Sequence, residues 1–410
     1  MASDRPEVHR VVEADVYKGD VLAGRLRRTG RGTVFGYARS YRAARLPAVA
    51  VSLPVSAQPV TAPDGRLPPF FAGLLPGGAR LRALAARLGA SPRDTLSLLV
   101  AVGGDCVGDV RVAATGHMPS DPPALAGAGA WSEVDFEDLR AATVAPGGGR
   151  VEQVALPGAG VTMSAAPSLS PLTHPSGSHI LKLDPPGRPR LAENEKFCLD
   201  LAEACGLAVA QAEVVHDRHG RSGLLVRRFD REALPNGSLR RLAQEDACQF
   251  LGRQPGESRG PTVSDIAGAV ARWSDVPLIA LRDLVRLLAV SHLVGNADLH
   301  ARDISIGTTL TDDVTLTPAY DLHTTLPYRA SPPVRGAGLG LDRGELTRSR
   351  LRDLGGRFGL AHRAVDRSLD RICDEAGGWL ARLGEIGFED HLTARLAQQV
   401  AGRRDDLGRR

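Results

Sequence analysis

The chain has 410 residues, 43% of them hydrophobic, so it can bury a large core, and this length predicts two or three domains. The first residues lack the apolar core of a signal peptide, and no later stretch offers the roughly 20 uninterrupted apolar residues that span a bilayer, so we expect a cytoplasmic protein with no membrane partner. The net charge is +4 with both signs interspersed along the chain, which argues against direct nucleic-acid binding. The five cysteines lack C-x-x-C spacing, which argues against a disulfide framework and a zinc site.

The first predicted domain is a mixed unit of strands and helix over residues 10–115, after a tail of residues 1–9. Apolar and polar residues alternate over residues 11–26 and 34–37, which predicts short antiparallel strands. One helix with a buried face is predicted from the i, i+3, i+4, i+7 spacing of Leu81, Leu84, Ala85 and Leu88. Residues 116–150 are rich in Ala, Gly and Pro and are predicted to be a linker or a mobile surface excursion.

The second domain, residues 151–243, has the element order of the smaller lobe of a protein kinase. A glycine turn is followed by a strand with a lysine, a helix with an acid and a further strand. These elements are Gly158-Ala159-Gly160, residues 179–183 with Lys182, residues 194–205 with Glu195, and residues 223–229.

The third domain, residues 244–402, is predicted to be mostly helical. Apolar stripes with helical spacing occur near residues 281–288, 365–372 and 392–400. The arginine-rich residues 403–410 are predicted to be a frayed, solvated tail.

Three aspartates near the first of these stripes have the pattern of a phosphotransfer site. Asp298 and Asp303 reproduce the spacing of the kinase sequence Asp-x-x-x-x-Asn, and Asp321 ends a strand-like run after a short hairpin. Such a site needs one carboxylate to orient the acceptor hydroxyl and further oxygen ligands for Mg²⁺.

Each of these residues also has a simpler interpretation. An aspartate in a loop is commonly a turn former or helix cap, and Glu195 in a first helical turn interacts favourably with the helix dipole. Lys182 is one of only three lysines beside 48 arginines, so its compact ammonium is harder to dismiss as a surface charge. The order of all the elements favours the kinase interpretation, because chance agreement of every one is far rarer than agreement of any single one.

Over nearly its whole length the chain resembles the HipA family of serine/threonine kinase toxins. The resemblance is carried by Phe70-Phe71 with Leu74-Leu75-Pro76, Gly103-Gly104-Asp105-Cys106-Val107-Gly108, His179-Ile180-Leu181-Lys182, Asn194-Glu195, Arg227-Arg228-Phe229-Asp230-Arg231, Gln244-Glu245-Asp246, Gly295-Asn296-Ala297-Asp298-Leu299-His300 and Pro318-Ala319-Tyr320-Asp321.

The resemblance implies an α+β, two-lobed protein-kinase-like (HipA-like) fold, with a mixed N-terminal subdomain and a mostly helical C-terminal lobe. It implies ATP and Mg²⁺ as cofactors, with Asp298 as catalytic base and Asp303 and Asp321 as magnesium ligands. Lys182 is implied to neutralise phosphate charge, and kinase logic suggests Glu195 as its partner. The other implied nucleotide-binding residues are Gly158, Ala159, Gly160, Arg227, Arg228, Phe229 and His300.

The resemblance also implies partners. The implied substrate is a protein, for studied members an aminoacyl-tRNA synthetase, and the neutralising partner is a helix-turn-helix antitoxin of the HipB type. Nucleic acid is then reached only through the antitoxin, and phosphorylation of the substrate would promote growth arrest and persistence.

The sequence departs from the family pattern at two places. Asp303 replaces an asparagine and adds negative charge near the triphosphate, while Ala155 replaces the serine that family members autophosphorylate. Val161 and Thr162 replace a Glu and a Lys beside the phosphates. Phosphate binding would then rest on backbone N–H groups and Lys182.

Two other function classes remain open. A degenerate phosphate loop is also expected of a nucleotide-binding HipA-like pseudokinase that acts as a scaffold for an antitoxin or another partner. Aminoglycoside kinases share the Asp-x-x-x-x-Asn logic, so a small-molecule phosphotransferase is the third reading, which the HipA-like N-terminal unit argues against. The acceptor and the oligomeric state are not encoded in any motif.

Overall fold

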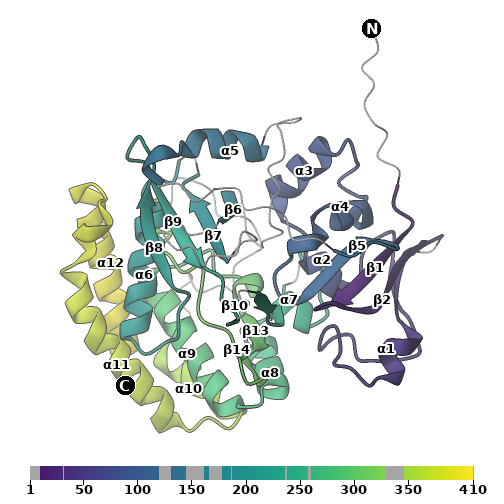
Figure 1. The fold of residues 1–410 in the computed structure, drawn as a ribbon. Coiled ribbons are helices and arrows are strands. Elements are labelled where there is room, and N and C mark those ends of the chain that lie inside the picture. The colour runs from purple at the N-terminus through teal and green to yellow at the C-terminus, as the bar shows by residue number, and fades with distance from the viewer. Residues whose placement is uncertain are drawn as a thin grey trace. The chain divides into compact units, whose positions relative to one another are not determined.

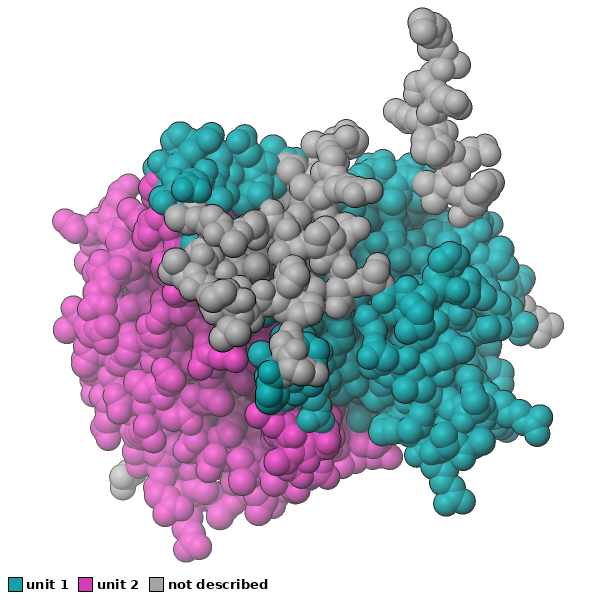
Figure 2. Space-filling view, in the orientation of Figure 1, with its two compact units in different colours: residues 1–181, 217–219, 230–255 teal, residues 182–216, 220–229, 256–410 magenta. Residues whose placement is uncertain are grey.

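The computed structural model describes residues 10–30, 32–119, 131–144, 161–165, 178–185, 187–235, 238–256, 260–328 and 346–409. Two compact units make up the chain, and Figure 2 colours them separately. Unit 1 comprises Met1–Leu181, Asp217–His219 and Asp230–Pro255, and unit 2 comprises Lys182–His216, Gly220–Phe229 and Gly256–Arg410. No helix among the described residues is long and apolar enough to cross a membrane.

Unit 1 is built on an antiparallel sheet with the strand order β4-β3-β2-β1-β5. Its strands are β1 (Glu13–Lys18), β2 (Val21–Thr29), β3 (Gly32–Tyr37), β4 (Val60–Pro63) and β5 (Val110–Ala114). The predicted strands over residues 11–26 and 34–37 are therefore present. The helices of this part are α1 (Arg39–Ala43), α2 (Pro69–Gly73), α3 (Gly78–Arg87) and α4 (Thr95–Val102), followed by the 3-10 helix η1 (Gly103–Asp105).

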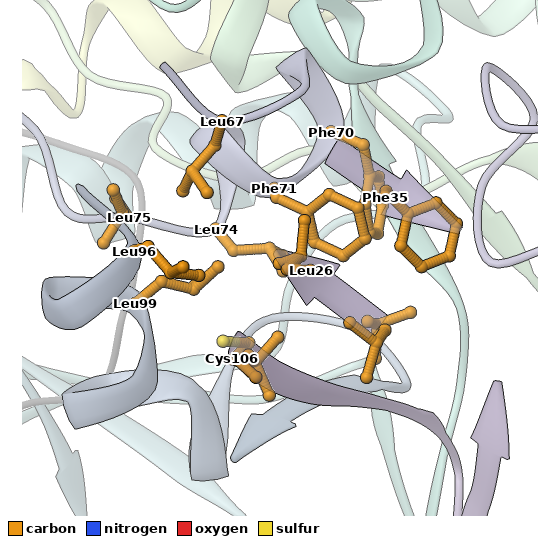
Figure 3. Packing of buried hydrophobic residues seen from close by; sticks show 14 of the residues in the cluster. Leu26, Phe35, Leu67, Phe70, Phe71, Leu74, Leu75, Leu96, Leu99 and Cys106 are labelled. Carbon is orange, nitrogen blue, oxygen red and sulfur yellow. The ribbon is translucent and has the colours of Figure 1, made fainter. Parts of the chain in front are cut away.

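The core of unit 1 lies between this sheet and its helices, as Figure 3 shows. Leu26 and Phe35 point inward from the strands, and Phe71 of α2 packs against Phe35 with ring centres 5.0 Å apart. Alternation along the strands places apolar side chains on the face that the helices cover. The sequence Phe70-Phe71 therefore has a packing role.

A buried ionic network closes unit 1 around Arg231. Its guanidinium donates to Asp105 at 2.9 Å and to Asp230 at 2.7 Å, and to the carbonyls of Cys106 and Gly108. The Arg231 side chain is only 1% exposed. Arg231 therefore links the motif to which it belongs, residues 227–231, to the motif of residues 103–108.

The remaining described elements of unit 1 include one that corrects a prediction. Residues 116–150 were predicted to be a linker, but they contain the 3-10 helix η2 (Trp131–Glu133) and α5 (Phe136–Val144). Trp131 and Phe136 are buried and pack edge to face, and this contact stabilises the described residues 131–144 of the stretch. The other elements are β6 (Val161–Ala165), β10 (Arg231–Ala233), β11 (Leu239–Arg241), β12 (Gln244–Asp246) and α7 (Ala247–Phe250); the division between the units falls within β7 (His179–Leu183).

Unit 2 combines a small sheet with a bundle of helices. Strands β7, β9 (Ser222–Arg227) and β8 (Ala212–His216) are neighbours in that order, and β8 and β9 are antiparallel. Helix α6 (Leu191–Ala204) contacts β8 and β9. The hairpin of β13 (Ser305–Thr308) and β14 (Val314–Leu316) follows the long helix α9 (Pro277–Val294). The other helices are α8 (Val263–Trp273), α10 (Arg348–Arg357), α11 (His362–Leu380) and α12 (Asp390–Gly408), with the 3-10 helices η3 (Ala301–Asp303), η4 (Leu326–Tyr328) and η6 (Leu383–Ile386).

Helix α9 lies at the centre of unit 2 and contacts α8, α10, α11 and α12 (Figure 1). Pro277 begins it, where a missing N–H costs no helical hydrogen bond. Gly295 ends it with φ 71°, a left-handed conformation that glycine adopts without strain. A Cβ at Gly295 would also lie 2.5 Å from the side chain of Leu326. The start of the following loop is therefore fixed by both conformation and space.

The C-terminal residues correct a second prediction. Residues 403–410 were predicted to be a frayed tail, but α12 continues to Gly408, and Leu407 is fully buried. Arg348 donates to the carbonyl of Leu407, and Arg404 donates to the carbonyl of Cys373. These bonds and the apolar burial hold the end of the chain against α10 and α11.

Candidate active site

The lysine of β7 and the acid of α6 form an ion pair. Lys182 Nζ lies 2.6 Å from Glu195 Oε1 and 3.1 Å from Asp321 Oδ1. The backbone N–H of Asp321 also donates to Glu195 Oε1, at 3.2 Å. Three residues that are far apart in the sequence therefore form one cluster in unit 2.

The electrostatics of this cluster follow from its burial and its opposite charges. Burial alone would lower the pKa of Lys182, but the carboxylates of Asp321 and Glu195 raise it above its ordinary value. Burial acts to raise the pKa of Asp321, but the lysine charge prevails and brings it to about 2. Burial raises the pKa of Glu195, and Lys182 opposes that effect. At neutral pH Lys182 is therefore a cation beside an ionised Asp321.

The loop after α9 has a rigid backbone. Asn296 is 2% exposed, and its side-chain oxygen accepts a hydrogen bond from the N–H of Asp298 at 3.1 Å. Thr325 donates its hydroxyl to the carbonyl of Gly295 at 2.9 Å and accepts from the N–H of Ala297 at 3.1 Å. The loop thus presents Asp298 from a fixed position.

The carboxylate of Asp298 faces two basic side chains. Arg188 Nη1 donates to its Oδ2 at 2.8 Å, and His323 Nε2 lies 3.7 Å from the same oxygen. The imidazole of His323 and the guanidinium of Arg188 lower the pKa of Asp298 well below its ordinary range and outweigh its burial. Burial lowers the pKa of His323, but Asp298, together with other nearby carboxylates, raises it overall.

Asp303 is paired with the histidine of the same loop. His300 Nδ1 lies 2.9 Å from Asp303 Oδ2, and the backbone N–H of His300 donates to that oxygen at 2.9 Å. Burial would lower the pKa of His300, but Asp303 raises it to about 9, so the imidazole is protonated at neutral pH. Burial raises the pKa of Asp303, against the effect of His300. The extra negative charge expected from Asp303 is therefore offset by His300.

Of the other predicted nucleotide-binding residues, Arg227, Arg228 and Phe229 are described by the structure. Arg227 is exposed and donates to Gln211, Arg228 is buried, and the ring of Phe229 lies 5.7 Å from that of Tyr320. Tyr320 immediately precedes Asp321, so this ring contact joins the segment after β9 to the segment that carries Asp321. The sequence predicted Asp321 at the end of a strand-like run, but β14 ends at Leu316 and Asp321 lies in the loop that follows. The predicted glycine turn Gly158-Ala159-Gly160 and Ala155 lie outside the described residues.

The carboxylates of the site are suitable ligands for a hard cation, but they do not form a complete metal-binding site by themselves. Within the described ranges, no group of three or more His, Cys, Asp or Glu side chains is arranged to hold a metal ion. Asp303 and Asp321 nevertheless supply carboxylate oxygens, which Mg²⁺ prefers, and magnesium commonly completes its coordination with water and substrate phosphates. These two carboxylates fit a magnesium ion that is also coordinated by water and phosphate oxygens.

Two side chains next to Asp298 were not anticipated from the sequence. Arg188 follows the sequence Pro-Pro-Gly and is one of 48 arginines, so no motif marks it. His323 stands two residues after Asp321, and its proximity in sequence to a predicted metal ligand was the only available signal.

The described geometry can be compared with known proteins. The HipA-like C-terminal domain model matches residues 155–380, and the HipA N-terminal domain model matches residues 14–113. Y4mE of Sinorhizobium fredii, named as a candidate kinase, is 30% identical over 87% of this chain and 88% of its own length. The serine/threonine-protein kinase toxin HipA of Shewanella oneidensis is 32% identical over 36% of each chain.

A solved structure shares the fold. The HipA chain in a complex described as Shewanella oneidensis HipA, HipB and operator DNA matches with a TM-score of 0.72 at 20% identity, covering 96% of each chain. The fold and the lysine, acid and aspartate arrangement thus define a protein of the kinase-like class, α+β and two-lobed. Within that class, the chain belongs to the HipA family.

Proposed function

We propose that this chain is an ATP- and magnesium-dependent serine/threonine protein kinase and the toxin of a toxin–antitoxin module. The observation that carries the proposal is the cluster of Lys182, Glu195 and Asp321. Phosphoryl transfer is catalysed mainly by positioning and by charge stabilisation, and a lysine held between a helix acid and a loop carboxylate supplies both. The relative named as a kinase toxin supports the same function.

The proposal assigns a separate role to each charged side chain of the site. Lys182, oriented by Glu195, binds phosphate oxygens, and Asp321 and Asp303 hold magnesium. Bound magnesium would neutralise charge that develops on the phosphate oxygens. The protonated His300 beside Asp303 keeps the loop from being too negative for a triphosphate.

Asp298 is proposed to act on the acceptor. Its depressed pKa makes it a weak base in the resting state, so its first task is to orient the hydroxyl by accepting a hydrogen bond. The acceptor oxygen bonds to the γ-phosphorus while the bond to the ADP oxygen breaks, and the hydroxyl proton passes to the Asp298 carboxylate. Late proton transfer is compatible with the loose transition state described for such reactions.

Nucleotide binding is proposed to use the remaining predicted residues. Backbone groups of Arg227, Arg228 and Phe229 would bind adenine, and the backbone of Gly158, Ala159 and Gly160 would bind phosphates. Because alanine stands at position 155, control through phosphorylation of a serine there is not available to this chain.

The proposed partners follow from the relatives. The similar solved structure is titled as a complex of HipA with HipB and operator DNA. We therefore expect a helix-turn-helix antitoxin of the HipB type and contact with nucleic acid only through it. The proposed acceptor is a cytoplasmic protein, with an aminoacyl-tRNA synthetase as the first candidate, whose phosphorylation would cause growth arrest and persistence.

The test is transfer of ³²P from γ-labelled ATP with Mg²⁺ in a bacterial lysate, with the wild-type chain and with Asp298→Asn. We expect one or more lysate proteins to be labelled by the wild type, and the initial rate to fall by about 10²- to 10⁴-fold with the variant. Mass spectrometry of the labelled protein identifies the acceptor and the modified serine or threonine.

A parallel binding measurement separates the remaining readings. Equal labelling with wild type and Asp298→Asn would refute the kinase proposal. If neither chain transfers phosphate but both bind ATP in a titration, the chain is a nucleotide-binding scaffold. Labelling of small hydroxylated metabolites in place of proteins would indicate a small-molecule phosphotransferase.

A further inference from the structure

The loop between β7 and α6 is fixed at both of its ends. It joins the strand of the active-site lysine to the helix of its acidic partner, and its described residues are 184–185 and 187–190. At its start, Asp184 Oδ1 accepts a hydrogen bond from the N–H of Ala192 at 3.0 Å. Near its end, the Tyr328 hydroxyl donates to the carbonyl of Pro189 at 2.9 Å. A loop held in this way can present one side chain from a defined position.

That side chain is Arg188. Its guanidinium lies 5.9 Å from the ring centre of Tyr328 and bonds to Asp298 Oδ2 at 2.8 Å. The side chains of Arg188 and Asp298 are 27% and 28% exposed, so the pair is partly shielded from water and from salt. A permanently charged guanidinium in this environment binds a carboxylate more strongly than a fully exposed one would.

The two basic groups near Asp298 approach the same oxygen. His323 Nε2 lies 3.7 Å from Oδ2, the atom to which Arg188 donates. Oδ1 of Asp298 has no hydrogen-bond partner among the residues that the structure describes. A carboxylate rotates broadly about its terminal bond, so binding one oxygen selects the direction of the other.

We propose that Arg188 is a positioning residue of the phosphotransfer site, which holds Oδ2 of Asp298 so that Oδ1 receives the acceptor hydroxyl. This inference rests on the proposed kinase function. In the transfer step, the acceptor O–H bond breaks, its proton moves to Oδ1, the oxygen–phosphorus bond forms and the bond from phosphorus to the ADP oxygen breaks. Arg188 itself exchanges no proton and acts only through Asp298.

An alternative is that Arg188 blocks the acceptor site, and removing it would then have the opposite effect on activity. If Arg188 occupied the oxygen that the acceptor needs, its removal would raise activity. The observed contacts favour positioning, because both basic groups approach Oδ2 and the described residues form no hydrogen bond with Oδ1.

The experiment compares Arg188→Met with Arg190→Met as a matched control. Arg190 lies in the same loop, but its side chain is 52% exposed and pairs with Glu193 at 2.9 Å. Initial rates of ³²P labelling are measured for one lysate protein whose labelling by the wild type depends on Asp298, over a range of ATP concentrations. ATP binding and the circular dichroism spectrum of each variant confirm that it is folded.

We expect Arg188→Met to lower the maximal rate by about ten- to a hundredfold, while the ATP concentration at half-maximal rate stays nearly constant. Arg188→Lys keeps the charge but lacks the planar fork and should restore part of the rate. Arg190→Met should label at the wild-type rate. In an Asp298→Asn background, Arg188→Met should cause no further loss, because its effect requires the carboxylate.

Three results would overturn the inference while leaving the kinase proposal intact. They are an Arg188→Met rate equal to or above that of the wild type, a loss confined to ATP affinity, and a full further loss in the Asp298→Asn background. Arg188→Gln serves as a second neutral variant if the methionine variant does not fold. Absence of any Asp298-dependent labelling by the wild type would overturn both proposals together.

Discussion

Glu245 in β12 is a buried acid whose charge should make the stability of unit 1 depend on pH. The side chain is buried, and its Oε1 accepts a hydrogen bond from the N–H of Val51 at 2.8 Å. Its Oε2 has no hydrogen-bond partner among the described residues. Burial raises the pKa of Glu245 from its ordinary value of 4.5 to about 8, although the Val51 N–H and Lys18 oppose this.

The direction of the effect follows from proton binding. Between about pH 4.5 and pH 8 the folded chain keeps the Glu245 proton while the unfolded chain has lost it. The contribution of Glu245 to the free energy of unfolding is therefore full below pH 4.5 and falls as the pH rises through this window. At about 1.4 kcal/mol per pH unit, the total loss is on the order of 5 kcal/mol.

Glu245→Gln tests this reasoning, because glutamine is neutral at every pH and keeps the oxygen that accepts from Val51. Urea denaturation of both chains, followed by circular dichroism between pH 5 and pH 8.5, gives the difference in free energy of unfolding. We expect the variant to gain stability relative to the wild type as the pH rises, by several kcal/mol in total. Glu133→Gln, at an exposed position of the same unit, is the control. A difference that stays constant across this pH range would refute the account.

Two further predictions concern other buried charges. Arg231→Met should lower the free energy of unfolding by about 3–5 kcal/mol, since it removes the guanidinium that bonds to the buried carboxylates of both Asp105 and Asp230. Urea denaturation measures this, and an unchanged midpoint would contradict it. Lys182→Met should reduce the phosphotransfer rate by about 10²- to 10³-fold, because the ammonium acts on phosphate charge. The labelling assay measures this on chains that a dichroism spectrum shows to be folded, and a rate near that of the wild type would contradict it.

Much of the fold could be predicted from local patterns. The apolar spacing of Leu81, Leu84 and Leu88 indicated α3, and the alternation around Lys18 indicated the first hairpin. Composition led to a wrong prediction where a few large buried side chains stabilise the local structure. Trp131 packs against Phe136 in an Ala- and Gly-rich stretch that was predicted to be a linker. Burial of a large aromatic side chain can stabilise a segment whose other residues have low helix propensity.

The prediction for residues 403–410 was wrong for a related reason. Its arginines suggested a solvated tail, yet Leu396, Val400 and Leu407 have helical spacing and are buried. The guanidinium of Arg404 bonds to a backbone carbonyl and so belongs to the packed structure. Charge content alone therefore did not distinguish a tail from the last turns of a helix.

The candidate site was only partly predictable. The order of elements in the chain suggested Lys182, Glu195 and Asp321 as a group, and the structure places them within hydrogen-bond distance of one another. Arg188 and His323 could not be assigned in the same way, because their contacts with Asp298 depend on the path of a short loop and on tertiary packing. The metal and nucleotide roles of the site residues stay predictions.

The measurement that tests the central claim most directly is the initial rate of γ-phosphate transfer to a protein serine or threonine, for the wild type and for Asp298→Asn at saturating Mg-ATP. We predict labelling by the wild type and a loss of about 10²- to 10⁴-fold in the variant, with ATP affinity preserved. Equal transfer by the two chains, or ATP binding by the wild type with no transfer to any protein, would contradict the claim.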